Sequence, residues 1–286
     1  MEKLQSRRGF LKKAGMTVCM SQLSMLGWSA GFSAIFSEGV NSSGEFSLLK
    51  LEKLLSGYKF PFIDNFSTDS FSSVYKLYNL YGSNSINAGD LSINSAVAGE
   101  KRQFNFSVSR LANNGIKSQK LNFKYIVSGD VLCQNNEILS PQKWNISSKI
   151  SISRDNEAFN GTGLKYEGEN KNGEIYLMTS GKLIKKAIAS IPLSWKWGLM
   201  AVVQNMAKVS LHELQFSMLD EFDTIYQNQK MKFRKKVSLD CGNNHLIDFN
   251  VFELTGDGMI PTVYWIDNLN RCIFVVSGME AYVLGV

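Results

Sequence analysis

Histidine, cysteine and proline are scarce in this chain, which has 2 His, 4 Cys and 4 Pro in 286 residues. Two histidines cannot build a three-histidine zinc site, and the cysteines form no CxxC pair. No glycine run completes the dinucleotide fingerprint or the phosphate-binding loop. These absences exclude the common metal and nucleotide cofactor motifs, so we expect no metal and no cofactor.

The positive charge of the chain is concentrated at its start. The formal net charge is +6, and residues 1–37 contribute +4 of it, leaving +2 for the rest. A nucleic-acid-binding domain needs basic residues gathered on its folded surface. The charge distribution therefore argues against nucleic acid as a partner.

Residues 6–12 read SRRGFLK, and no charged residue follows from Ala14 to Ser37. This run resembles the S-R-R-x-F-L-K consensus of bacterial twin-arginine signal peptides. The resemblance implies recognition by the twin-arginine translocase through Arg7, Arg8, Phe10, Leu11 and Lys12. It also implies export to the periplasm or the medium after folding in the cytoplasm. Cleavage of this segment and its retention as an N-terminal anchor are both compatible with the sequence.

Cysteine pairing is left open by the sequence of the exported part. Cys133, Cys241 and Cys272 lie after the signal segment. An odd number leaves at least one thiol without an intramolecular partner. One disulfide among the three is compatible with the sequence, which does not select the pair.

The sequence predicts three regions. Residues 1–37 form the signal segment, and residues 38–85 form a linker with helical runs at 46–55 and 71–80. From residue 86 to 286 short alternating segments such as Phe104-Asn-Phe106-Ser-Val108 are separated by turn residues. Residues 192–206 predict a turn followed by an inserted helix. The fold class is therefore mainly β: an antiparallel curved sheet or partly closed barrel with an N-terminal helical segment and one inserted helix.

Large aromatic residues are the first candidates for a binding site. Trp195, Trp197, Tyr264 and Trp265 could line a sheet cavity and hold a sugar ring or an apolar ligand. Trp195 and Trp197 are too close in sequence for both to be buried on one helix face. The alternative role for this set is to plug the mouth of a barrel core.

Carboxylates are the candidates for catalysis without histidine, since glycoside cleavage needs two of them facing each other. Asp257 and Asp267, with Arg271, are candidate catalytic residues. The structural alternative places Asp267 and Arg271 in a hairpin turn as an ion pair. Residues 256–271 also resemble the closing hairpin of uncharacterised periplasmic proteins.

Three functions are consistent with these patterns. The first is an exported, pre-folded binding or accessory protein whose ligand is a carbohydrate, an apolar molecule or a partner protein. The second is a cofactor-independent hydrolase or lyase acting on polysaccharide or envelope material. The third is a small subunit co-exported with a redox enzyme.

Overall fold

The structure of the chain is a computed structural model. The structure describes residues 67–79, 86–113, 121–154, 157–189, 192–222, 224–240 and 246–285. The signal segment, the linker, the helix predicted at 46–55 and Cys241 lie outside these residues. Among the described helices, none is long and apolar enough to cross a membrane.

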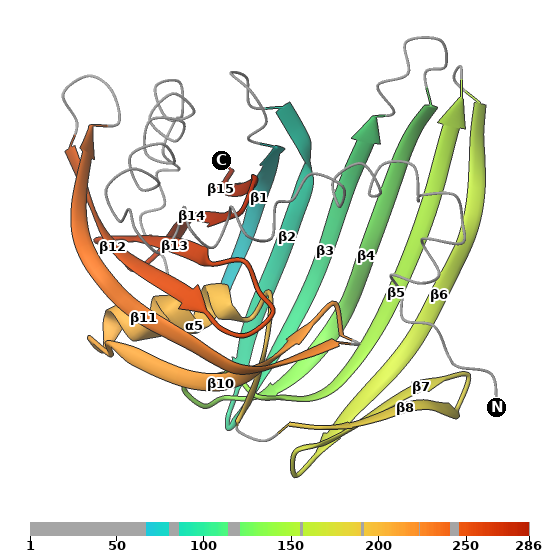
Figure 1. The fold of residues 1–286 in the computed structure, drawn as a ribbon, viewed down its shortest axis with the longest axis horizontal. Helices are drawn as coiled ribbons and strands as arrows, with labels where there is room; N and C mark the ends of the chain where they lie inside the picture. The colour runs from blue at the N-terminus through green and yellow to red at the C-terminus, as the bar shows by residue number, and fades with distance from the viewer. Residues whose placement is uncertain are drawn as a thin grey trace. The chain divides into compact units, whose positions relative to one another are not determined.

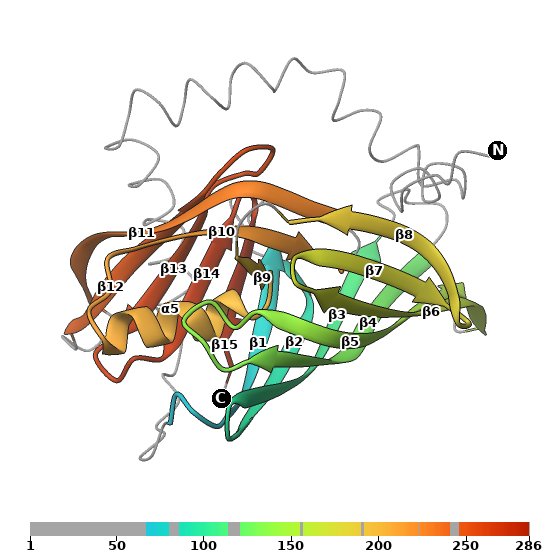
Figure 2. The ribbon, with the colours of Figure 1, turned by 90° about the horizontal axis from the view of Figure 1, so that it is seen from below.

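The described strands form one sheet of 15 strands with the order β8-β7-β6-β5-β4-β3-β2-β1-β15-β14-β13-β12-β11-β10-β9. Figures 1 and 2 show that this sheet is strongly curved. Every neighbouring pair is antiparallel except β9 with β10. The predicted mainly β fold with a curved antiparallel sheet is therefore confirmed. The strands are β1 (Phe71–Asn79), β2 (Ile86–Ala98), β3 (Lys101–Asn113), β4 (Leu121–Gln134), β5 (Pro141–Arg154), β6 (Glu157–Lys171), β7 (Glu174–Thr179), β8 (Lys182–Ile188), β9 (Leu193–Trp195), β10 (Glu213–Asp220), β11 (Thr224–Asp240), β12 (Leu246–Thr255), β13 (Thr262–Asp267), β14 (Cys272–Ser277) and β15 (Glu280–Leu284).

The helix predicted at residues 71–80 is wrong, because this segment is strand β1. Its burial alternates: Phe71, Ser73, Tyr75 and Leu77 are buried, and the residues between them are exposed. That is the period of a strand with one solvated face. β1 pairs with β2 and β15, so the sheet begins before the predicted boundary at residue 86.

The inserted helix predicted after Pro192 is confirmed as α5 (Leu199–Lys208). Seven of its residues are buried: Leu199, Met200, Ala201, Val202, Val203, Gln204 and Met206. α5 packs against β13 and β14. Gly198 precedes it, and a Cβ there would lie 2.2 Å from Nε1 of Trp195. Only glycine therefore lets the helix begin so close to the indole.

An aromatic cluster fills the concave side of the sheet. Phe104 and Phe106 of β3, Trp144 of β5, Trp195 of β9 and Phe222 of the β10–β11 turn are all buried. The Trp195 ring lies 5.2 Å from Phe104 and 5.6 Å from Phe222, measured between centroids. Rings from four separate elements therefore meet where the curled sheet encloses its core.

Candidate ligand-binding surfaces

The four aromatic residues singled out from the sequence are all buried. Trp195 is 0% exposed, Trp197 8%, Tyr264 3% and Trp265 5%. The expectation that Trp195 and Trp197 are too close for both to be buried on one helix face does not apply to this structure. Trp195 ends a strand and Trp197 lies in the turn before α5, so they do not share a helix face.

These four side chains have different neighbours. Trp195 packs in the aromatic cluster, whereas Trp197 lies edge-on to Tyr282 at 5.4 Å. Trp265 lies edge-on to Phe249 at 5.9 Å. Tyr264 precedes Trp265 in β13 and therefore faces the opposite side of the sheet. Trp195 and Trp265 contact rings of other core residues, and the Trp197 ring also lies 5.3 Å from Lys196 Nζ. A role of the four residues in ligand binding stays a prediction.

Asp267 and Arg271 form the predicted turn and ion pair, which is confirmed. Asp267 Oδ2 lies 2.7 Å from Arg271 Nε, and the two side chains are only 2% and 8% exposed. Asp267 Oδ1 accepts hydrogen bonds from the backbone N–H groups of Leu269 at 3.0 Å and Arg271 at 2.8 Å. Both carboxylate oxygens are thus engaged in holding the β13–β14 turn.

Asp257 has different neighbours from Asp267 and Arg271. It is exposed in the turn after β12, and Asn228 Nδ2 donates to its Oδ2 at 3.2 Å. Among the described residues, the hydrogen-bond and ion-pair partners of the buried Asp267 differ from those of the exposed Asp257. A catalytic role for Asp257, Asp267 or Arg271 stays a prediction.

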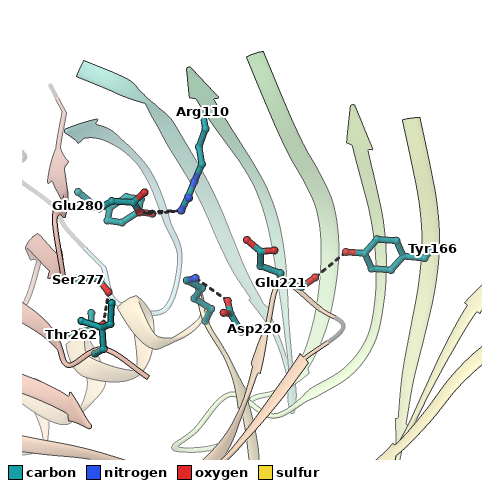
Figure 3. Close-up of polar contacts among 10 residues, drawn as sticks. Arg110, Tyr166, Asp220, Glu221, Thr262, Ser277 and Glu280 are labelled. Carbon is teal, nitrogen blue, oxygen red and sulfur yellow. Dashed lines mark hydrogen bonds and ion pairs between the residues drawn. The ribbon is translucent and has the colours of Figure 1, made fainter. Parts of the chain in front are cut away.

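Arg110 belongs to a set of polar residues beside the concave core (Figure 3). We call this set the polar cluster, and its members are Arg110, Glu280, Tyr282, Tyr166, Glu221, Lys196 and Asp220. Its Nη2 donates to Glu280 Oε2 at 3.1 Å and to the Tyr282 hydroxyl at 2.9 Å. Burial acts to lower the pKa of Arg110, but Tyr282, Glu280 and Glu221 outweigh it and raise that pKa. The guanidinium therefore links β3 to β15 as a permanent cation.

The same cluster holds the turn between β10 and β11 in place. The Tyr166 hydroxyl donates to the Glu221 carbonyl oxygen at 2.9 Å. Lys196 Nζ lies 2.8 Å from Asp220 Oδ1. The first contact ties β6 to the β10–β11 turn, and the second ties the loop after β9 to β10.

The opposite face of β3–β6 carries a groove of about 680 Å³. Four of its polar side chains stand in one cross-strand row. Asn105 of β3 is paired with Asp130 of β4, Asp130 with Asn145 of β5, and Asn145 with Glu167 of β6. Neighbouring strands lie about 4.8 Å apart, so the row places one polar side chain per strand spacing. We call these four residues the polar row.

The polar row is available to a ligand. Within the described part of the chain, no protein hydrogen bond engages these four side chains, and all four residues are exposed. A second row beside it adds Ser128, Ser147 and Lys165 to the groove lining. The groove therefore offers carboxylate, amide, hydroxyl and ammonium groups on regular strands.

Sequence reasoning missed the polar row although the signal was present. Phe104 and Phe106 are buried and flank Asn105, while Trp144 and Ile146 are buried and flank Asn145. Alternation places Asn105 and Asn145 on the solvated face. Strand register, which aligns them with Asp130 and Glu167, could not be read from the sequence.

Comparison with known proteins shows the fold alone. No protein-family profile matches the chain, and no curated protein matches it in sequence. A crystal structure of a beta-barrel-like protein of a domain of unknown function, DUF1849, from Brucella abortus is similar, with a TM-score of 0.50. The match covers 77% of this chain and 97% of that one at 9% sequence identity.

Proposed function

We propose that this chain is an exported, pre-folded binding protein that holds a polyhydroxylated ligand, a glycan, in the groove on the outer face of β3–β6. The observation that carries the proposal is the polar row: Asn105, Asp130, Asn145 and Glu167 aligned across four strands in a groove of about 680 Å³. A cavity of this size falls in the range of about 300–1,000 Å³ typical of small-ligand sites.

The chemistry of the row favours sugar hydroxyls. Carboxylates only accept hydrogen bonds, whereas an amide side chain both accepts and donates. Each hydroxyl can therefore find both kinds of partner along the row of Asn105, Asp130, Asn145 and Glu167. Because these side chains stand on paired strands, little backbone entropy is lost when the ligand binds.

An apolar ligand fits the concave side less well. Trp195 and Phe222 are buried there with Phe104 and Phe106 in direct ring contact. A fatty chain would have to displace these rings. The outer groove needs no such rearrangement.

The export part of the proposal is supported by SRRGFLK at residues 6–12. Replacing Arg7 and Arg8 with lysine should leave the protein in the cytoplasm, because the translocase reads the arginine pair. Cell fractionation measures this outcome. Unchanged export of the double variant would refute the twin-arginine assignment while leaving the groove proposal standing.

The groove is tested by titrating the purified chain with neutral oligosaccharides, namely chitohexaose, cellohexaose and maltohexaose. Saturation-transfer NMR and calorimetry detect even weak complexes. Asn145→Ala and Asp130→Ala should each lower the affinity for a bound sugar about five- to tenfold, the loss expected for one or two hydrogen bonds. Asn268→Ala is the matched control, because Asn268 is an exposed amide outside the groove.

Two results would count against glycan binding in this groove. The first is that none of the three oligosaccharides forms a detectable complex with the protein. The other is a complex whose affinity falls equally in Asn145→Ala and in Asn268→Ala, which would place the sugar elsewhere on the surface.

A glycan hydrolase is a second candidate, favoured by the two carboxylates of the polar row. Asp130 and Glu167 stand two strand spacings apart, about 10 Å between Cα atoms. Inverting glycosidases hold their carboxyl groups about 6.5–9.5 Å apart, a separation that side chains leaning together could reach. Release of new reducing ends that is lost in Asp130→Asn and Glu167→Gln would establish hydrolysis. Binding of an oligosaccharide without release of new reducing ends would establish that the protein binds glycans and does not cleave them.

A further inference from the structure

The β7–β8 hairpin stands at one end of the sheet and exposes apolar and basic side chains together. β8 is the terminal strand, so among the described strands only one of its edges pairs, and Figure 1 shows β7 and β8 projecting as a hairpin. Six of the seven β8 residues are exposed. Leu183 is 58% exposed, Ile184 38% and Ile188 66%.

The charge of this hairpin is positive. Residues 174–188 contain Lys182, Lys185 and Lys186, and their single carboxylate is Glu174, which pairs with Lys186 at 2.9 Å. Exposed apolar side chains interleaved with lysines are typical of segments that lie in a membrane interface. There the apolar groups enter the acyl boundary and the lysine stems reach back to anionic headgroups.

The geometry points to an anionic lipid bilayer as the partner of the β7–β8 hairpin. This inference does not depend on the ligand of the groove. β7 and β8 are joined by a tight two-residue turn, Ser180 and Gly181, with φ of 51° and 74°. The exposed apolar side chains of β8 would enter the acyl boundary while its lysines stay at the level of the headgroups.

A strand from another protein chain fits the outer edge of β8 less well than an anionic bilayer does. Lysines on an edge strand oppose pairing with another strand, and a second copy of β8 would bring lysines opposite lysines. In addition, Gln227 Nε2 donates to the Ile188 carbonyl oxygen at 3.1 Å, which occupies one end of the strand. Lysines that hinder strand addition strengthen binding to anionic lipid.

Binding is measured by co-sedimentation of the full chain with two kinds of vesicle. One is an equal mixture of phosphatidylglycerol and phosphatidylcholine, and the other is phosphatidylcholine alone. We expect binding to the anionic vesicles that weakens with added salt. Replacing Lys182, Lys185 and Lys186 with glutamine should lower the partition coefficient about fivefold per lysine, or on the order of a hundredfold in all.

The matched control replaces Lys124, Lys235 and Lys236, which are exposed on other strands, with glutamine. This variant has the same net charge and should bind almost as well as the parent chain. Leu183→Ser with Ile188→Ser should also weaken binding, whereas Ile260→Ser with Leu269→Ser, at exposed turn positions, should not. All of these sites are on the surface, so the variants should keep the far-UV circular dichroism of the parent.

A probe on the hairpin separates its contribution from that of the basic segment 1–37, which is present in every variant. Ile184→Cys, made in a chain whose Cys19 and Cys241 are replaced by serine and labelled with an environment-sensitive fluorophore, should shift its emission to the blue with anionic vesicles. No shift, an equal shift with phosphatidylcholine alone, or equal loss of binding in the two lysine variants would overturn the proposal. Capture of soluble poly-glutamate without vesicle binding would also overturn it, in favour of an acidic protein partner.

Discussion

Phe222 lies in the turn between β10 and β11, yet its ring stacks on that of Phe106 in β3, with centroids 5.2 Å apart and planes inclined by 19°. β3 and β10 stand far apart in the strand order. The contact between Phe106 and Phe222 therefore shows how tightly the sheet is curved. Phe222 is 2% exposed, so the tip of a hairpin is part of the core.

The turn that carries Phe222 has an unfavourable backbone. Glu221 has a φ of 47° and Phe222 a φ of 64°, in the left-handed region that bulky residues avoid. Such a conformation costs about 1–3 kcal/mol per residue. Burial of the ring stabilises by about 2 kcal/mol, and the Tyr166 hydroxyl bonded to the Glu221 carbonyl adds about 1 kcal/mol. The turn is thus held by contacts with the opposite part of the sheet.

Phe222→Ala should lower the free energy of unfolding by about 3–5 kcal/mol, because it leaves a cavity among the rings of the aromatic cluster. Urea unfolding followed by circular dichroism measures this change. Tyr166→Phe is the matched control: it keeps the ring and removes one hydrogen bond, for a loss of about 1 kcal/mol. Equal small losses in both variants would mean that the ring of Phe222 does not contribute to the core.

Gly168→Ala should destabilise the protein through Trp144. A Cβ at position 168 would lie 2.0 Å from Cε2 of that indole, so the ring would have to move. Overpacking of this kind costs about 1–3 kcal/mol. The tryptophan emission spectrum should shift as the indole is displaced.

Gly163→Ala provides the comparison on the same strand. Among the described atoms, its Cβ would lie close to the Ser148 carbonyl oxygen alone, at 3.1 Å. We expect a smaller loss of stability and an unchanged emission spectrum. Equal behaviour of the two variants would show that Trp144 does not pack on Gly168.

The sequence predicted best where one physical pattern acted alone. Phe104, Phe106 and Val108 alternate with polar residues and are buried on one face of β3. The closing hairpin was likewise predicted, and the Asp267–Arg271 pair follows from a short turn between two apolar strands. In both cases the information lies within a few neighbouring residues.

Where local patterns misled or were silent, distant partners decided the outcome. Phe71 and Tyr75 are spaced as on a helix face, but pairing of β1 with β2 and β15 fixes the segment as a strand. Trp195 is buried because β9 pairs with β10 and faces the aromatic cluster. The polar row depends on the register of four strands, which local patterns do not encode.

Removing either member of the Asp267–Arg271 pair should lower the free energy of unfolding by about 3–5 kcal/mol, because the remaining charge stays buried without its partner. Asp267→Asn and Arg271→Met are suitable single variants, measured by urea unfolding. Asp267→Asn also weakens the two backbone hydrogen bonds that close the turn.

The double variant gives the coupling between the two side chains. We expect its loss to be clearly smaller than the sum of the single losses, since no unpaired charge remains in it. Lys76→Met with Asp90→Asn serves as the control, because this ion pair is exposed. Additive effects at Asp267 and Arg271 would contradict a buried coupled pair.

The protein should lose stability at alkaline pH through Cys272 and Tyr264. Burial raises the pKa of both groups above their ordinary values of 9.0 and 10.0. The unfolded chain therefore releases these protons at a lower pH than the native protein. The stabilisation is fully present below about pH 9, the ordinary value for a thiol, and declines as pH rises toward the native pKa values, by up to about 1.4 kcal/mol per pH unit for each group.

Urea unfolding between about pH 8 and pH 11 measures this slope. Cys272→Ala should make the decline shallower in the lower part of that range, because one of the two buried thiols in the described part of the chain, Cys133 and Cys272, is gone, and thiols titrate first in the unfolded chain. The hydrogen bond from the Tyr75 hydroxyl to the backbone oxygen of residue 272 is unaffected by this substitution. A free energy of unfolding that stays constant up to about pH 11 would mean that these groups ionise equally easily in the native and unfolded chains, and hence that the β13–β14 core admits water.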